Sequence, residues 1–423
     1  MNKLERCCAY KSILQEELIP AMGCTEPIAL AYAAAYARKI LGTEPDKVLV
    51  EASGSIIKNV KAVIVPNTDM MHGISAAAAA GIIAGDADKK LEVLSTVTPE
   101  QTKEIKAFME RVAIPVKHLE KGCVFDIIIT LHKGEAYSKV RIANQHTNIV
   151  LVEKDGKKLV DKGVVEKDNG RTDRSLLNMK DIWEYINTVD IAELKPILEP
   201  QVTYNYAIAQ EGLRGDYGGN VGRVLLEAFG REDVANRARA MAAAGSDARM
   251  NGCEEPVVIN SGSGNQGITI AVPIKVYADE LKVSEDKLYR ALALGNLVAI
   301  HEKTPIGVLS AYCGAVSAGA GAGAGIAYLC GGDLEAVSTT VSNALAILSG
   351  MICDGASASC AAKISSSVEA GILGFKMYQK DKKFQGGDGI VGADIEETIA
   401  NVGVLAKKGM EQTNNTIIEI MIK

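Results

Sequence analysis

Aromatic side chains are scarce in this chain: they make up 4% of its 423 residues, and there is one tryptophan. Hydrophobic residues nevertheless account for 48% of the sequence, so Ala, Gly, Val, Ile and Leu must fill the core. A core of small side chains favours closely packed helices over an aromatic-rich β-sandwich. The length of the chain predicts two domains, or one domain with a large elaboration.

Long runs of one charge are also missing. The net charge is −6 and there is no block of Lys or Arg, so nucleic acid is not an expected partner. The first stretch, MNKLERCCAYKSILQEEL, is charged and lacks the apolar segment of a signal peptide, which predicts a cytoplasmic protein. Residues 304–332 and 336–353 carry no charge, but GAVSAGAGAGAG is too poor in large side chains to favour lipid. We expect two packed interior helices there and no membrane span.

Several enzyme motifs are absent. The five histidines form no HExxH pattern, and neither a G-x-S-x-G elbow nor a Walker A loop occurs. Gly262-Ser-Gly264-Asn-Gln-Gly267 matches GxGxxG, but Pro273 falls where the helix of a dinucleotide site should continue, and no second strand with an acidic end follows. A Ser/Gly/Asn turn before a helix instead predicts a nest of N–H groups for a small anion such as a carboxylate. An ordinary Gly-rich turn is the alternative.

The patterns change character near residues 198–202. Before this point they indicate helices, strands and a loop: helices at 3–19, 28–41, 74–85, 99–112 and 179–195, strands with a hairpin at 47–68, a meander at 123–157 and an exposed loop at 155–175. The rest of the chain is an almost continuous Ala/Gly/Ser-rich helical pattern. We therefore predict an α+β protein, with a mixed N-terminal domain at 1–199 and a mainly helical domain with tightly packed interior helices at 200–423.

Nine cysteines are more than packing requires, and disulfides are disfavoured in the cytoplasm. Cys353 and Cys360 would lie about 10.5 Å apart in one straight helix. Gly355 and the serines around it make a local break plausible, which would bring these thiols together with Cys313. Three convergent cysteines without a second CxxC or CxxH pair suit an iron–sulfur cluster better than a zinc finger. Three structural cysteines buried among small residues are the alternative.

Five segments spread over nearly the whole chain carry a resemblance: AMGCTEPIALA, QHTNI, RMNGCEEPVVINSGSGNQGITIAVPI, GNLVAIHEKTPIGVLSAYCGA and SGMICDGASASCAAKISSSVEAGI. Together they resemble the L-cysteine desulfidase family, within the wider group of oxygen-labile, iron–sulfur-dependent serine dehydratase-like proteins. The resemblance implies a carbon–sulfur lyase that splits L-cysteine into hydrogen sulfide, pyruvate and ammonia. It implies a [4Fe–4S] cluster in place of pyridoxal phosphate, one that aerobic preparation can remove. A homodimer is also expected.

The resemblance implies roles for residues of three kinds. The cluster ligands would be Cys313, Cys353 and Cys360, leaving one iron open to bind the substrate's sulfur. The small amino-acid substrate would be held by its carboxylate in the nest, with help from the HTN segment: Ser261, Gly262, Ser263, Gly264, Asn265 and Gln266, with His146, Thr147 and Asn148. The ligand cysteines of bacterial serine dehydratases are spaced further apart than Cys353 and Cys360, which favours cysteine over serine. L-serine as the substrate, and a non-catalytic or redox-sensing cluster protein, are the alternatives.

The pattern GCxEP occurs twice, at 23–27 and at 252–256. Cys24, in the first copy, matches the cysteine for which the family suggests removal of the substrate's α-proton. That role requires a lowered thiol pKa, which a cluster, a cation or the N-terminus of the Ala-rich helix that follows, with Pro27 at N1, would supply. The alternative role for Cys24 is to cap the open iron in the resting enzyme. We expect Cys253, in the second copy, to be structural, and the roles of His301, Glu302 and Lys303 are left open.

Overall fold

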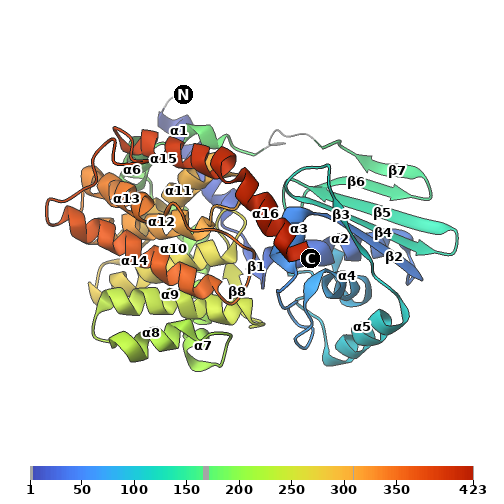
Figure 1. The fold of residues 1–423 in the computed structure, drawn as a ribbon. Helices are drawn as coiled ribbons and strands as arrows, with labels where there is room; N and C mark the ends of the chain where they lie inside the picture. The colour runs from blue at the N-terminus through green and yellow to red at the C-terminus, as the bar shows by residue number, and fades with distance from the viewer. Residues whose placement is uncertain (1–2, 165–170, 308, 423) are drawn as a thin grey trace.

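The computed structural model describes residues 3–164, 171–307 and 309–422, and it shows two lobes (Figure 1). One lobe is built on a six-stranded sheet in the order β3-β2-β4-β5-β6-β7, in which β2 and β3 are parallel and the other neighbours antiparallel. Its strands are β2 (Lys47–Ser53), β3 (Val116–Leu119), β4 (Asp126–Lys133), β5 (Ala136–Ala143), β6 (Ile149–Lys154) and β7 (Lys157–Asp161).

The helices of this lobe stack on the sheet in layers. The layers contain α2 (Thr25–Leu41), α3 (Gly54–Val60), α4 (Gly73–Ala84), the short η1 (Ala87–Glu92) and α5 (Pro99–Arg111). α2 packs on β4 and β5, α4 packs on α2, and α5 packs on α4. The contact between α2 and α4 is close because both helices are rich in alanine, and Gly81 has no room for a side chain against the backbone of Ala31.

The second lobe consists almost entirely of helices (Figure 1). They are α1 (Lys3–Glu17), η2 (Arg174–Leu176), α6 (Met179–Thr188), α7 (Ile191–Arg214), α8 (Val221–Phe229), α9 (Val234–Met250), α10 (Gly264–Glu280), α11 (Glu285–Ile306), α12 (Gly314–Leu329), α13 (Leu334–Leu348), α14 (Cys360–Tyr378), α15 (Ile395–Val404) and the π-helical turn η3 (Leu405–Gly409). α12 lies at the centre, packed against α10, α11, α13 and α14.

The glycines of α12 explain how four helices surround it. A Cβ atom added at Gly319 would lie 2.3 Å from the carbonyl oxygen of Ser367 on α14, and one at Gly321 would lie 2.4 Å from that of Gly295 on α11. Only glycine allows such an approach, and the gain is dense backbone packing in place of aromatic side chains. The tightly packed interior helices predicted from the charge-free stretches are confirmed. None of the helices in the described ranges is both long and apolar enough to cross a membrane.

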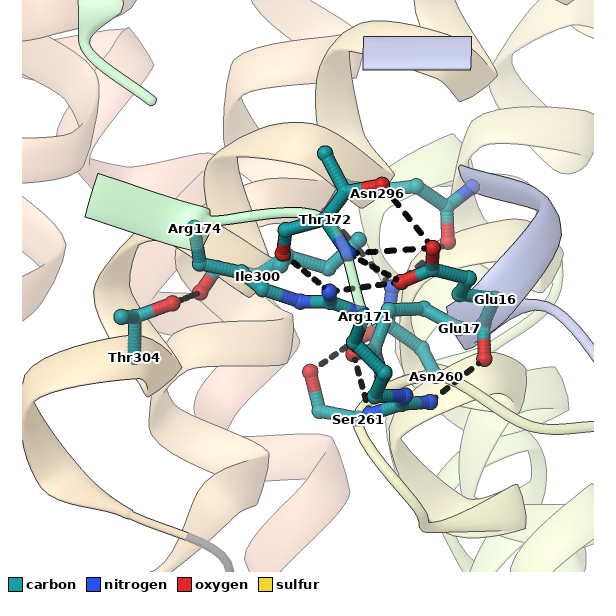
Figure 2. A network of polar contacts seen from close by, with 10 residues as sticks. All are labelled: Glu16, Glu17, Arg171, Thr172, Arg174, Asn260, Ser261, Asn296, Ile300 and Thr304. Carbon is teal, nitrogen blue, oxygen red and sulfur yellow. Dashed lines mark hydrogen bonds and ion pairs between the residues drawn. The ribbon is translucent and has the colours of Figure 1, made fainter. Parts of the chain in front are cut away.

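The chain passes between the lobes three times. After α1 it forms β1 (Pro20–Met22), which pairs antiparallel with β8 (Pro256–Val258), and then enters the sheet lobe. It returns where Arg171 and Arg174 form ion pairs with Glu17 at the end of α1, and Arg174 also pairs with Glu16 (Figure 2). Finally α16 (Glu411–Ile422) crosses back to pack on α3 (Figure 1).

The α+β fold class is confirmed, with a mixed sheet in the N-terminal half and helices in the C-terminal half. The predicted division after residue 199 falls inside α7 and stays a prediction. Of the predicted exposed loop at 155–175, residues 165–170 lie outside the described residues, and Lys157–Asp161 form β7.

Two local predictions were wrong. The hairpin expected within 47–68 is a strand followed by the helix α3, because the Ser53 hydroxyl caps that helix by accepting from the amide of Ile56. The helical stretch expected at 179–195 is divided between α6, which ends at Thr188, and α7, which begins at Ile191 and runs through Pro196 and Pro200. Fully buried Leu194 and Leu198 keep α7 packed across this stretch, which offsets the hydrogen bonds that the prolines remove.

We predict that Gly371→Ala destabilises the protein, although alanine is the better helix former. A Cβ atom at Gly371 would lie 2.3 Å from the carbonyl oxygen of Gly319, so α14 would have to move away from α12. The expected loss is roughly 1–3 kcal/mol in the free energy of unfolding, measured by chemical denaturation. Gly350→Ala is the matched control, because a Cβ atom added at Gly350 would meet no heavy atom within 4 Å. Equal stability of the two variants would contradict this account of the α12–α14 packing.

Candidate active site

A cavity lies between the two lobes, and most of the predicted site residues line it. The predicted residues on its wall are Cys24, His146, Ser261, Gly262, Ser263, Asn265, Gln266, Cys313, Cys353 and Cys360. Thr147, Asn148 and Gly264 are not on the wall. Cys253 is buried elsewhere, so the structural role expected for it stays a prediction.

A short antiparallel bridge brings Cys313 and Cys353 together. The bridge joins Tyr312 to Ile352, between the segments that precede α12 and follow α13. The amide of Cys313 donates to Met351 O at 3.1 Å, and the amide of Cys353 donates to Ala311 O at 2.6 Å. Two cysteines 40 positions apart in the sequence therefore reach one wall of the cavity through backbone hydrogen bonds.

The break expected between Cys353 and Cys360 is present, because α14 begins only at Cys360. Gly355 has a φ of +109°, a conformation that other residues rarely adopt, and a Cβ atom there would lie 2.4 Å from the carbonyl oxygen of Lys58. This glycine lets the loop turn closely over α3 and deliver Cys360 to the cavity. Three of the four cavity cysteines thus lie at helix N-termini: Cys24 is the N-cap of α2, Cys313 is the N-cap of α12, and Cys360 is the first residue of α14.

Cys24 reaches the cavity because β1, just before it, pairs with β8. Cys24, Val63 and Met250 form a small apolar cluster, and Cys360 packs against this cluster. The N-terminal segment therefore folds back onto the helical lobe, as the two GCxEP motifs required if they were to serve one site. α2 begins at Thr25, so Pro27 occupies the third helical position and not the first.

The environment of Cys24 does not provide the lowered pKa that was expected. Burial and the negative charge of Glu26 raise the pKa of this thiol, and they outweigh the opposing effect of Arg249. The Cys24 Sγ–H group donates to Glu26 Oε2 at 3.3 Å. A thiol that donates to a carboxylate is held in its protonated form, so the helix N-terminus alone does not make Cys24 a thiolate.

The nest forms a tight turn between β8 and α10. Ser261 and Gly262 both have positive φ angles, 49° and 78°, and Asn260 and Ser263 exchange backbone hydrogen bonds across them. The Asn260 side chain donates to Asn296 Oδ1 at 2.9 Å and accepts from the Ser261 hydroxyl at 2.8 Å (Figure 2). β8 pairs antiparallel with β1, so the parallel βαβ unit of a dinucleotide site is not formed here.

The first turn of α10 leaves amide donors free for a ligand. The first helical bond is Gly267 N to Ser263 O, and the Ser263 side chain does not cap the helix. The amides of residues 264–266 therefore have no partner within the helix, and the helix dipole favours an anion beside them. Gln266 adds a buried side chain whose Oε1 atom has no hydrogen-bond partner in the described ranges.

His146 faces this turn from the sheet lobe. Its ring packs edge-on against Phe125, and its Cε1 atom is 2.9 Å from the Cβ position of Gly262, so glycine is required there. Burial lowers the pKa of His146, and its Nε2 atom lacks a partner within the described residues. Thr147 is exposed and the Asn148 side chain donates to Ala143 O, so these two close the β5–β6 turn and do not face the cavity.

Three buried cations near the cavity were not assigned roles from the sequence. Lys58 Nζ donates to the backbone oxygen of Cys353 at 3.1 Å and to Asn414 Oδ1 at 3.0 Å, and Lys303 Nζ donates to Gly307 O. Arg249 Nε donates to Gly23 O at 3.1 Å. None of the three forms an ion pair within the described chain. Burial lowers the pKa of Lys303 to about 8.

Glu26 is the one carboxylate among the described residues that line the cavity. The buried cations around the cavity have only neutral partners. Because an unpaired buried charge is costly, the cavity favours an anionic occupant. The sequence signals for these residues were weak. Arg249 and Glu26 lie within the quoted motifs, but nothing in their spacing singles them out.

No group of three or more His, Cys, Asp or Glu side chains in the described ranges is arranged to hold a single metal ion. The cysteines are nevertheless near enough to affect one another. Burial raises the pKa of Cys313 to about 12, and the neighbouring Cys353 and Cys360 thiols contribute to the rise.

The three residues before the charge-free stretch diverge in the structure. Lys303 lines the cavity, whereas His301 Nε2 contacts Glu396 Oε2 at 2.7 Å. Glu302 is 1% exposed, and neither carboxyl oxygen has a hydrogen-bond partner in the described chain. Burial raises the pKa of Glu302 well above its ordinary value and outweighs the opposing effect of Ser317, which favours the protonated carboxyl in the folded protein.

We predict that Glu302→Gln stabilises the protein increasingly as the pH rises. The unfolded chain releases this proton near a pKa of about 4.3, so the wild type loses stability above that pH while the neutral amide does not. The melting temperature of the variant relative to wild type should increase from about pH 5 to about pH 8. A difference that does not change with pH would contradict the protonated state of Glu302.

Glu396→Gln is the control for this experiment. Burial by itself would raise the pKa of Glu396, but hydrogen bonds from His301 and from the Met179 amide lower it below the ordinary value. This group therefore stabilises the fold above its unfolded pKa, and the variant should lose stability as the pH rises. The two variants are expected to show opposite trends.

Known proteins resemble this chain over almost its whole length. The family model for the serine dehydratase alpha chain matches residues 88–419, which include every cavity residue except those contributed by the start of α2 and by α3. A UPF0597 protein of Desulfitobacterium hafniense is 54% identical over 414 residues, covering 98% of this chain and 96% of the relative. UPF0597 proteins of Lachnoclostridium phytofermentans and Treponema denticola are 51% and 46% identical, with 97% and 98% of this chain covered and 98% and 97% of each relative. This chain belongs to the serine dehydratase alpha-chain family.

Proposed function

We propose that the protein is a carbon–sulfur lyase that eliminates hydrogen sulfide from L-cysteine and yields pyruvate and ammonia. The observation that carries the proposal is the convergence of four cysteines from three separate segments on one cavity. That cavity also contains the free amides of the α10 N-terminus, a neutral histidine and buried cations. Soft thiol donors beside an anion-binding turn suit a cofactor and an amino-acid carboxylate in the same space.

The residues present fit a [4Fe–4S] cluster held by Cys313, Cys353 and Cys360. Thiolate sulfur is the ligand that iron–sulfur clusters use, and the segments of Cys313 and Cys353 meet at the bridge between Tyr312 and Ile352. The nearby positive charges of Lys58 and Lys303 would stabilise thiolates, since Cys313 and Cys353 both act to raise the pKa of each lysine. When bound, a cluster with three protein ligands supplies an open iron that acts as a Lewis acid on the substrate's sulfur.

The turn at residues 261–266 would orient the substrate. Its free amides and the Ser261 and Ser263 hydroxyls belong to the same cavity as the thiol of Cys313. A carboxylate bound there holds the amino acid by one end and leaves its β-carbon and leaving group free to face the thiols. Burial keeps His146 neutral, so its unpartnered Nε2 atom can exchange a hydrogen bond with the substrate without adding charge.

Cys24 and Glu26 would handle the α-proton. The thiol first passes its own proton to the carboxylate that it already contacts, and the thiolate then takes the proton from Cα. The Cα–H electrons form the Cα–Cβ double bond as the Cβ–S bond breaks and sulfide leaves. Water then hydrolyses the 2-aminoacrylate product to pyruvate and ammonia. Because burial and Glu26 raise the pKa of the Cys24 thiol, this step requires that pKa to fall when the cofactor and the substrate bind.

L-serine is the second candidate substrate, and the description of the matching family model favours it. The same elimination would then release water in place of hydrogen sulfide. A hydroxyl is the poorer leaving group, so serine turnover would depend more strongly on the Lewis acid. Nothing in the described cavity wall selects oxygen over sulfur, so the ratio of kcat/KM for the two amino acids decides between them.

We predict that anaerobically reconstituted protein binds about four irons per chain and releases sulfide and pyruvate in equal amounts from L-cysteine. Iron analysis and the two product assays check this, and kcat/KM for L-serine measured on the same sample ranks the substrates. Cluster-loaded protein that is inert towards both amino acids would overturn the proposal and favour a non-catalytic or redox-sensing role.

We further predict that Cys353→Ala and Cys24→Ala fail in different ways. The first variant should lose both the cluster and the activity, because it lacks a ligand. The second should keep its iron and lose activity roughly 10²- to 10⁴-fold, the usual cost of removing a general base. Iron content, the absorbance spectrum and sulfide release are measured on each variant.

Cys253→Ser is the matched control, since Cys253 is a buried cysteine outside the cavity wall, and it should keep both properties. Loss of the cluster from Cys24→Ala would contradict the base assignment and indicate that Cys24 is itself a ligand.

A further inference from the structure

Arg249 occupies the junction between the two halves of the cavity. It lies in the last turn of α9, is 4% exposed and lines the cavity wall. Its Nε group donates to the carbonyl oxygen of Gly23, directly before Cys24, at 3.1 Å. Its Nη1 group donates to Asn265 Oδ1 in the first turn of α10 at 2.9 Å. The guanidinium is therefore fixed between the candidate base and the anion-binding turn.

The guanidinium also lies directly against the N-terminus of α10. A Cβ atom at Gly264 would be 2.4 Å from Arg249 Nε, so only glycine at this position leaves room for the guanidinium. The free amides of residues 264–266 begin at the same point. Two kinds of N–H donor, one carrying a full charge and one carrying the helix dipole, thus lie side by side on the cavity wall.

Arg249 has donors to spare. Its hydrogen bonds use Nε and Nη1, and Nη2 has no partner in the part of the chain that the structure describes. No Asp or Glu in that part forms an ion pair with it, whereas Lys363, another cation of the same cavity, is paired with Asp354. A buried guanidinium with neutral partners and a free N–H₂ group lacks only an anion.

Arg249 shares the cavity wall with Cys24, the candidate base, with His146 from the sheet lobe and with Cys360, a candidate cluster ligand. An anion bound beside Arg249 would therefore lie within reach of the groups that perform the reaction.

We propose that Arg249 binds the substrate's α-carboxylate, together with the α10 amides, and so restricts the substrates to amino acids with a free carboxylate. This inference rests on the proposed function, because it names the group that selects the substrate class in the same cavity. A guanidinium binds carboxylate oxygens through paired N–H donors, a geometry that lysine does not reproduce. Arg249 is then a specificity-determining residue that contacts the substrate.

The test uses two ligands without a leaving group, L-alanine and L-alaninamide, so that binding is measured without turnover. Isothermal titration is carried out on the full chain, both as purified and after anaerobic reconstitution. The wild type should prefer L-alanine, and Arg249→Gln should reduce this preference roughly 10- to 100-fold, as expected for loss of a hydrogen-bonded charge partner. Arg249→Lys should retain part of the preference.

Arg239→Gln is the matched control. Arg239 lies on the same helix and pairs with Glu369 outside the cavity, so the ratio of the two affinities should stay at the wild-type value. The inference is overturned if Arg249→Gln weakens both ligands equally, which is the result of a purely structural role. It is also overturned if the wild type binds L-alanine no better than L-alaninamide, or binds neither.

Failure of the proposed function gives a different result. Reconstituted wild type would then be inert towards L-cysteine and L-serine, while the change in the alanine-to-alaninamide ratio on replacing Arg249 would still be measured. Sulfide and pyruvate assays on the same preparations separate the two outcomes.

Discussion

The arrangement of the cavity depends on the pairing of β1 with β8. These two strands of three residues run antiparallel, and each leads directly into a functional segment. β1 is followed by Cys24 and β8 by the turn at residues 261–266. Because the strands are antiparallel, these segments leave the pair at opposite ends, and the hydrogen bond from Thr25 to Gly262 O joins them. The Asn205 side chain holds the other edge of β8 by bonding both the amide and the carbonyl of Val258.

Further contacts extend from this pairing across the lobe boundary. The Thr25 hydroxyl donates to Gly262 O at 2.9 Å, and Arg249 Nε donates to Gly23 O. Each contact joins the start of α2 to the anion-binding turn or to α9. A short two-stranded sheet is only marginally stable alone, and here the flanking side-chain bonds and the helices around it supply the rest.

The cavity's chemistry follows from its charge distribution. Buried Lys58, Lys303 and Arg249 donate to carbonyl and amide oxygens, which leave their positive charge uncompensated. Three thiolate ligands and a substrate carboxylate would compensate this charge. The thiolates would lie near Lys58 and Lys303, and the carboxylate would lie near Arg249. The unpaired buried charges destabilise the empty cavity, and the same charges give it affinity for anions.

The sequence was sufficient to predict the architecture of the helical half and most of the cavity wall. Small residues at helical spacing predicted the packing of α12, and Pro273 together with the missing second strand argued against a dinucleotide site. Cys313, Cys353, Cys360 and Cys24 do line one cavity, although their roles stay predictions.

The environment of those residues could not be predicted in the same way. The raised pKa of Cys24 results from burial and from Glu26, and burial depends on the lobe that packs over α2. The approach of Lys58 to the loop of Cys353 joins positions almost three hundred residues apart. The place of Arg249 depends on a glycine in another helix, and no local spacing encodes such contacts.

The contact between α16 and α3 has a consequence for how the protein is made. Lys58 emerges early from the ribosome, but its partner Asn414 lies in α16. The hydrogen bond between them therefore forms only after α16 has been synthesised. Domains that fold during synthesis do so from the N-terminus, whereas the wall of this cavity is built from residues between Cys24 and Ile364. The wall can therefore close only after Ile364 has been synthesised, and any cofactor that needs the finished wall must be inserted after that point.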